Sequence, residues 1–219
     1  MASEGAAGSA KARRRTPDEI HQLLLDAASA LFAEQGYAAT TTREIATAAG
    51  VPEVMLYRHF GSKGRLFSEA SLQPFNDFLG EFASSWGAHA DETSRDEEYM
   101  RGFVGRLYDL ARDRRRLIVD LRAAAEYEPE ILAPVGDGRP LLDRLAALAA
   151  VGNEAMRTRG VDDTDTEFAV RAIISMVTSA AALGPLLFGS NAAELDREHV
   201  VDELSRMARH AIGARRRSR

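Results

Sequence analysis

The sequence predicts an all-α protein. Apolar residues recur with the 3.6-residue period of a helix along most of the 219 residues, and the alternating runs typical of half-buried strands are nearly absent. Glycine and proline interrupt this pattern at the points where one helix would end and the next begin. With 45% hydrophobic and 28% charged residues, the chain has the composition of a globular protein. We therefore expect about nine helices packed around at least one hydrophobic core.

The first helix is expected to begin after Thr16. Threonine is a good N-cap, Pro17 fits the first turn, and two acidic residues follow at the positive end of the helix dipole. An apolar face then repeats at helical spacing until Gly36 ends the helix. Residues 1–15, which precede it, are rich in Ala, Gly and Ser and then basic, so we expect a disordered arm there. The residues of the apolar face are Ile20, Leu23, Leu24, Ala27, Ala28, Leu31 and Phe32.

Two short helices follow the first one. The stretch TTRE from Thr41 is a capping box that opens the second helix, and Gly50 closes it. Pro52 stands at the first position of the third helix, which ends near Phe60. Two short helices joined by a glycine-containing turn, after a longer packing helix, form the pattern of a helix-turn-helix.

Longer helices make up the rest of the chain. One stretch, residues 172–193, carries no formal charge, but it is too polar and too short in its apolar part to span a membrane, so we expect a buried or interface helix. Pro74 lies within the fourth helix and is expected to kink or end it near Gln73. The expected helix spans are 62–86, 95–112, 114–127, 138–159, 164–188 and 196–213.

Residues 40–67 read TTTREIATAAGVPEVMLYRHFGSKGRLF, and FAEQGYAA precedes them at the end of the first helix. This ordered pattern resembles the DNA-binding domain of the TetR (tetracycline repressor) family of bacterial transcriptional regulators over residues 16–67. The resemblance implies a three-helix helix-turn-helix head over residues 16–61. It also implies a larger helical effector-binding and dimerisation domain over residues 62–213, followed by a basic C-terminal tail at 214–219.

The resemblance assigns DNA contacts to three places in the head. The start of the second helix lies near bases or phosphates, the exposed side of the third helix faces the major groove, and the start of the fourth helix meets a phosphate. Tyr57, His59 and Lys63 are assigned to phosphates. The expected DNA-binding residues are Thr42, Arg43, Glu53, Val54, Met55, Tyr57, Arg58, His59 and Lys63.

Several of these assignments have alternatives. Tyr57 is either a phosphate contact or a core aromatic, and Glu53 either accepts a hydrogen bond from cytosine or is solvated. The basic arm at residues 13–15 either reaches DNA or is a solubilising tail. Met55 stands where the family commonly has threonine, which favours contact of Val54 or Met55 with a thymine methyl group. Other departures from the family pattern are Pro52, commonly serine, and Gly64, usually an acid.

The last two helices are expected to form a homodimer interface. The helix over 164–188 is apolar nearly all round, so it must be covered on most sides, and the helix over 196–213 has one apolar face. Doubled about a two-fold axis they form a four-helix interface, the family's usual arrangement, whereas packing within one chain is the alternative. The expected interface residues are Phe168, Ala172, Met176, Ala180, Leu183, Val200, Leu204, Met207 and Ala211.

Aromatic residues gather in the fourth, fifth and sixth helices. They are candidates to line a pocket for a small-molecule effector, and each has the alternative of an ordinary core position. The candidate pocket residues are Phe75, Phe78, Phe82, Trp86, Phe103, Tyr108 and Tyr127.

Catalytic classes find no support in the sequence. The chain has no cysteine, its five histidines follow no metal-ligand spacing, and it has neither a phosphate-binding glycine loop nor a serine elbow. We therefore expect no enzyme, no cofactor and no metal, and a cytoplasmic protein without a membrane partner. The prediction is a ligand-responsive regulator, a repressor that binds a palindromic operator in double-stranded DNA as a homodimer and is released by a small molecule. The alternatives are an activator, or a helical small-molecule-binding or structural protein without specific DNA binding.

Overall fold

The computed structural model describes residues 15–87, 96–132, 140–158, 165–189 and 196–213. This part of the chain is all-helical, as expected, with ten α-helices and one 3-10 helix. None of its helices is both long enough and apolar enough to cross a membrane. The elements are α1 (Pro17–Gln35), α2 (Thr42–Ala49), α3 (Glu53–Phe60), α4 (Lys63–Gly87), α5 (Asp96–Asp113), α6 (Arg115–Tyr127), the 3-10 helix η2 (Pro129–Leu132), α7 (Pro140–Thr158), α8 (Thr166–Ala182), α9 (Gly184–Leu187) and α10 (Arg197–Gly213).

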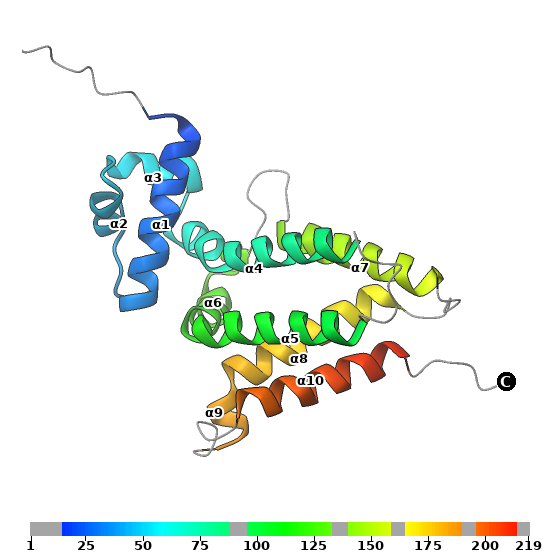
Figure 1. Cartoon of the computed structure of the whole chain (residues 1–219). Coiled ribbons are helices and arrows are strands. Elements are labelled where there is room, and N and C mark those ends of the chain that lie inside the picture. The colour runs from blue at the N-terminus through cyan, green and yellow to red at the C-terminus, as the bar shows by residue number, and fades with distance from the viewer. Residues whose placement is uncertain (1–14, 88–95, 133–139, 159–164, 190–195, 214–219) are drawn as a thin grey trace, which may run out of the picture.

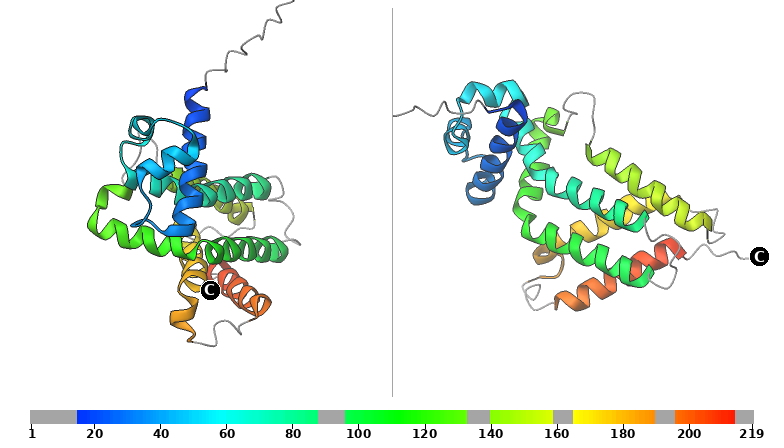
Figure 2. Two further views of the ribbon diagram at one scale, coloured as in Figure 1. Left: turned by 90° about the vertical axis from the view of Figure 1, so that its left-hand side faces the viewer. Right: turned by 45° about the horizontal axis from the view of Figure 1, so that its top comes forward.

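The helices form a small head and a larger body. Figure 1 shows α1, α2 and α3 at one end of the molecule, and α4 leading from them into the body. In the body α4 packs on α7, and α5 packs on both α8 and α10. The two further views in Figure 2 show the same separation, with the head joined to the body near α4 and α6. In this junction α1 packs on both α4 and α6, and α3 packs on α4.

The local signals in the sequence set the ends of the head helices. Thr16 caps α1 and Thr41 caps α2, each in a complete capping box. Gly50 ends α2 with a φ of 63° and a ψ of 40°, the left-handed conformation that glycine adopts without steric cost. Pro52 is the N-cap of α3 rather than its first residue, and it supplies no side-chain hydrogen bond to the helix.

The hydrophobic core of the head continues into the body. Leu24, Phe32, Ile45, Leu56 and Phe60 are fully buried or nearly so, as the apolar pattern predicts. The same cluster includes buried residues that follow the expected domain boundary at residue 61. Those residues are Leu66, Phe67 and Ala70 of α4, Leu117 and Leu121 of α6, and Ile131 of η2. The first two turns of α4 and part of α6 therefore belong to the core of the head.

Proline acts differently at two positions of the body. Pro74 lies inside α4, which runs from Lys63 to Gly87 and so agrees with the expected span of 62–86. Of the two outcomes expected at Pro74, the helix does not end near Gln73, and a kink there stays a prediction. Pro185 follows a real break: α8 ends at Ala182, and a separate one-turn helix, α9, replaces the last turns of the helix expected over 164–188. The periodic pattern alone did not distinguish these two outcomes.

Ion pairs join α10 to α5 along their length. Arg197 donates to Asp109 through Nε at 2.8 Å, Arg101 donates to Asp202 at 2.6 Å, and Arg209 lies 3.0 Å from Glu97. The Arg197 guanidinium lowers the pKa of the Asp109 carboxyl, because its hydrogen bonds favour the charged form. These contacts hold α10 in a fixed register on α5.

Close packing of α7 against α8 leads to a prediction at Gly152. A Cβ atom there would lie 2.8 Å from Thr166 Cγ2 and 3.6 Å from the Trp86 ring. We expect Gly152→Ala to lower the free energy of unfolding, because overpacking costs about 1–3 kcal/mol and the gain in helix propensity is only about 1 kcal/mol. Adding Thr166→Ser removes the obstructing methyl group, keeps the hydroxyl, and should restore stability in urea unfolding. Equal stability of Gly152→Ala and wild type would show that this contact relaxes freely.

Candidate nucleic-acid interface

The head presents one face of α3 to solvent. Leu56 and Phe60 anchor the opposite face in the core, where they meet Ile45 of α2. Small residues on α2, Ala46 and Ala49, are buried between the helices and allow a close crossing. The orientation of α3 is therefore set by the core, and its free face is held rigidly.

Apolar and basic side chains share this free face. Val54 is 68% exposed and Tyr57 is 50% exposed, while Glu53 and Arg58 are also exposed. Tyr57 is thus not a core aromatic. Met55 is half-buried, so a thymine-methyl contact falls more naturally to Val54. The free face of α3 thus carries an exposed aliphatic and an exposed aromatic side chain beside charged ones.

A hydrogen-bonded group links α2 to this face. The Thr42 hydroxyl donates to Glu53 Oε1 at 2.6 Å, and the same hydroxyl lies 3.4 Å from the Tyr57 hydroxyl. Arg43, the next residue of α2, is exposed. The structure therefore brings Thr42, Glu53 and Tyr57 together, a contact between the two helices that sequence spacing did not indicate.

Lys63 is only partly available to a phosphate. Its Nζ lies 4.3 Å from the centre of the Tyr37 ring, and burial lowers the pKa of its ammonium group. The Tyr37 hydroxyl donates to Glu128 Oε2 at 3.3 Å. Burial, followed by the nearby Glu128 carboxylate, raises the pKa of Tyr37 to about 12. Glu128 follows α6, so this group also connects the head to the body.

His59 is half-buried rather than free on the surface. Its ring lies 5.8 Å from the ring of His21, whose Nε2 donates a hydrogen bond to Glu69 Oε1 at 2.7 Å. Burial, and then the neighbouring His21, lower the pKa of His59. This shift favours the neutral ring, which offers a phosphate a single N–H donor.

Arg15 corrects one expectation about the arm. We expected residues 1–15 to be disordered, but Arg15 donates from Nη1 to the Gly50 carbonyl at 2.8 Å, at the C-terminal end of α2. A cation at this end of a helix is favoured by the dipole. Residues 1–14, and with them the rest of the basic arm, lie outside the described residues, as do residues 214–219 of the expected tail.

The junction of head and body is closely packed at Gly64. A Cβ atom there would lie 2.7 Å from Ile131 Cγ1, and Ile131 is 1% exposed. On the other side of the junction, Arg116 of α6 donates to the carbonyls of Glu34 and Gln35 at the end of α1. Sequence reasoning identified Gly64 only as a departure from the family pattern. The residues of η2 carried no signal that they would pack against Gly64.

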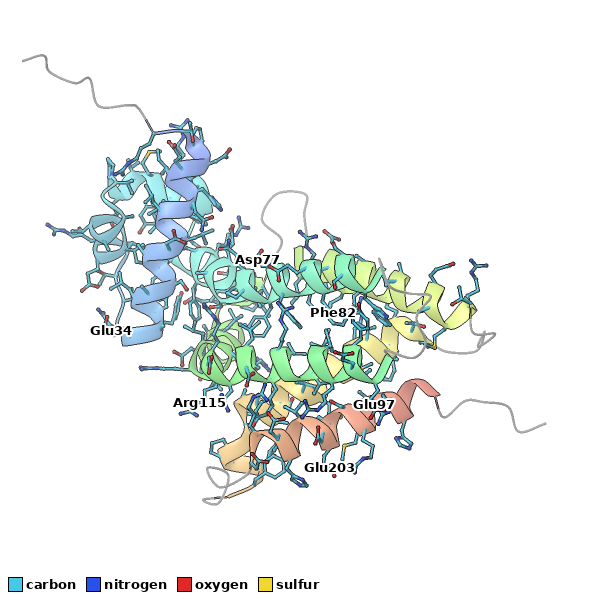
Figure 3. All side chains as sticks on the ribbon, viewed as in Figure 1. Glu34, Asp77, Phe82, Glu97, Arg115 and Glu203 are labelled. Atoms are coloured by element: carbon cyan, nitrogen blue, oxygen red, sulfur yellow. The ribbon has the colours of Figure 1, made fainter. Side chains whose placement is uncertain are left out.

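Six of the seven candidate pocket residues form one cluster, and Tyr127 is the exception. Phe75, Phe78, Phe82 and Phe103 are buried, with Phe78 and Phe82 at 5.4 and 4.6 Å from the Phe103 ring centre, and Phe82 lies between α4 and α5 in Figure 3. Trp86 and Tyr108 pack against this cluster and are partly buried. Tyr127 does not join it. At 88% exposed, it lines a groove of about 550 Å³ between α6 and α8.

The expected interface residues differ in how far they are buried within the single chain. Val200 and Leu204 are already buried within the single chain, so for them packing within the chain is the correct interpretation. Met176 and Ala180 are half-buried, and Ala211 lies in the part of α10 whose side chains are not described. The exposed members of the set are Phe168, Ala172, Leu183 and Met207.

Comparison with known proteins finds similarity to a family of regulators within the head. The profile described as "Bacterial regulatory proteins, tetR family" matches residues 24–70. The HTH-type transcriptional repressor KstR2 of Rhodococcus jostii is 43% identical over 74 residues, which are 34% of this chain and 33% of that protein. The HTH-type transcriptional regulator AcrR of Shigella flexneri is 43% identical over 60 residues, 27% of this chain and 28% of AcrR. The matched segment thus spans about a third or less of these relatives.

Solved structures share the fold over most of the chain. A structure described as a TetR-family transcriptional regulator from Mesorhizobium loti has a TM-score of 0.63 at 23% identity, covering 90% of this chain and 98% of that one. FadR of Thermus thermophilus, solved with lauroyl-CoA, has a TM-score of 0.55 at 18% identity and covers 91% and 98%. FadR of Bacillus subtilis, solved with stearoyl-CoA, has a TM-score of 0.54 at 17% identity and covers 87% and 98%. These likenesses show that body and head together adopt this fold.

Proposed function

We propose that this chain is a ligand-responsive transcriptional repressor. The reason is that its head resembles the DNA-binding domain of the tetR family of bacterial regulatory proteins. The protein acts in the cytoplasm as a homodimer that binds a palindromic operator, and a small-molecule effector releases it. The members of this family are transcriptional regulators rather than enzymes.

One observation carries the DNA-binding part of the proposal. The exposed Val54 and Tyr57 stand on the free face of α3, with exposed Arg43 and Arg58 beside them. An eight-residue helix anchored on its other face is short and rigid enough to enter a major groove, where apolar groups meet thymine methyls and basic groups meet phosphates or guanine.

The aromatic cluster supports an effector with an apolar part. Phe78, Phe82 and Phe103 are buried between α4 and α5 as stacked and tilted rings, so an apolar group that enters this part of the core meets aromatic rings. Two of the solved structures with this fold hold acyl-CoA molecules. Mass spectrometry of small molecules that co-purify with the protein tests this part directly, and a polar, charged molecule without an apolar group would contradict it.

The route from effector to DNA runs through α4 and the α6–η2 segment. An effector alters operator affinity only if it binds one arrangement of the two heads better than the other. Because Ile131, Leu117 and Leu121 belong to the core of the head, a shift of α6 repositions α3 as well as α4.

Selection from a random DNA pool tests the proposal against the alternative, a helical protein without specific DNA binding. A repressor enriches a palindrome whose half-site centres are about one helical turn apart. The bound promoter should then lose transcription in a reconstituted assay, whereas increased transcription would indicate an activator. A pool in which no sequence is enriched supports the alternative.

Arg43 gives a specific test of the interface. We expect Arg43→Ala to weaken operator binding by about 1–3 kcal/mol while thermal unfolding stays unchanged, because the side chain is exposed. Fluorescence anisotropy at moderate salt measures the change. Arg122→Ala is the matched control, since Arg122 lies on α6 and pairs with Glu126 at 2.6 Å. If both variants bind like wild type, Arg43 lies outside the interface.

A further inference from the structure

The Thr42–Glu53 hydrogen bond places a carboxylate on a surface that otherwise suits DNA. Its 2.6 Å distance is typical of a hydroxyl donating to an ionised carboxylate. Both residues stand in the first turns of their helices, Thr42 in α2 and Glu53 in α3, so the bond spans the two helices of the motif. The carboxylate is therefore held in one orientation although Glu53 is exposed.

A stabilising role for Glu53 explains only part of this arrangement. An acid in the first turn of α3 is favoured by the helix dipole, and Pro52 supplies no side-chain cap. The dipole, however, acts on the charge in any side-chain orientation. The bond to Thr42 also fixes the direction in which the Glu53 carboxylate points. A hydrogen bond to a partner atom at one defined place requires such a fixed direction.

The partner follows from the chemistry of a carboxylate. Ionised Glu53 only accepts hydrogen bonds, and phosphates repel it, so it lowers affinity for DNA in general. In the major groove guanine presents two acceptors, thymine presents an acceptor, and adenine presents a donor beside an acceptor. Cytosine presents its N4 amino donor without an adjacent acceptor. With Thr42 on Oε1, the remaining acceptor sites of the carboxylate suit this donor.

We infer that Glu53, oriented by Thr42, selects cytosine at one position of each operator half-site. The inference rests on the proposed function and adds to it a determinant of operator sequence. Thr42 acts here as a positioning residue, and Glu53 makes the base contact. Guanine and thymine are rejected at this position because their acceptors face the carboxylate.

Random-pool selection followed by binding measurements tests this inference. Wild type should enrich cytosine at one position of each half-site, and exchanging that base pair should weaken binding by about tenfold. Glu53→Gln should change the preferred base to adenine, which glutamine reads through N6 and N7, or reduce the preference below about threefold. Thr42→Val should keep cytosine as the preferred base but reduce the discrimination by about threefold, because the carboxylate then samples several orientations.

Matched controls separate this effect from charge and from fold. Glu34→Gln makes the same change of charge near the C-terminal end of α1, where Figure 3 labels Glu34. This variant should alter affinity for DNA without altering base preference. Thr47→Val removes another hydroxyl of α2, one that bonds the Arg43 carbonyl at 2.7 Å, and should leave the preference unchanged. Thermal unfolding confirms that each variant is folded.

The outcomes distinguish the inference from the proposed function. An enriched palindrome whose bases are the same for wild type and Glu53→Gln overturns the inference and leaves the function intact. A change with Glu53→Gln but none with Thr42→Val overturns the positioning role of Thr42. If wild type enriches no sequence, the proposed function fails and the inference fails with it.

Discussion

Phe168→Glu should convert the protein into folded monomers and reduce operator affinity by more than about 100-fold. Phe168 is 69% exposed on α8, Ala172 of the same helix is also exposed, and so is Leu183, the residue that caps its C-terminal end. An aromatic group at the centre of an interface commonly contributes 2 kcal/mol or more, so a charge there should weaken dimerisation at least about 30-fold. DNA affinity falls further, because two half-sites require two linked heads.

Sedimentation and operator binding, measured on the same samples, check this prediction. Leu142→Glu is the control, since Leu142 is a similarly apolar, 37% exposed residue of α7, and it should remain a dimer. Leu204→Glu should behave differently from Phe168→Glu: Leu204 is buried within the chain, so a charge there should unfold the protein. A Phe168→Glu protein that stays dimeric would move the interface away from α8.

Gly64→Ala is expected to lower the free energy of unfolding by about 1–3 kcal/mol, because its methyl group would overlap Ile131. The added Cβ would lie 2.7 Å from Cγ1 and 3.1 Å from Cδ1 of a fully buried side chain. Ile131→Ala removes both atoms and should cost about 2–5 kcal/mol through the cavity that it leaves. In the double variant the new methyl group occupies part of that cavity. The double variant should therefore lose at least about 0.5 kcal/mol less unfolding free energy than the sum of the losses of the two single variants.

Urea unfolding of the two single variants and the double variant measures this coupling. Gly102→Ala serves as the control, because a Cβ at Gly102 in α5 meets nothing within 4 Å and should stabilise the helix by about 0.5–1 kcal/mol. The Gly64→Ala variant also bears on function, since Gly64 adjoins Lys63 at the start of α4. If Gly64→Ala proves as stable as Gly102→Ala, then η2 moves aside to accommodate the added methyl group. In that case η2 does not transmit its own position to the head.

Local signals in the sequence determined the helices of the head and the helix-turn-helix. The capping boxes at Thr16 and Thr41, and the left-handed Gly50, depend on atoms a few residues apart. Such interactions form in the same way in any tertiary context, so the sequence alone predicts where α1 and α2 begin and end. The exposed face of α3 was likewise predicted, because the apolar period places Leu56 and Phe60 together on the opposite side.

Only the tertiary structure decided what covers each apolar face. The periodic pattern shows that a helix has such a face, but it contains no information about the element that packs there. Val200 and Leu204 are buried against other helices of the same chain while Phe168 is exposed, although the same period selected all three. The contact of Ile131 with Gly64 and the bond from Thr42 to Glu53 likewise join residues brought together by packing, so each required the folded molecule to be recognised.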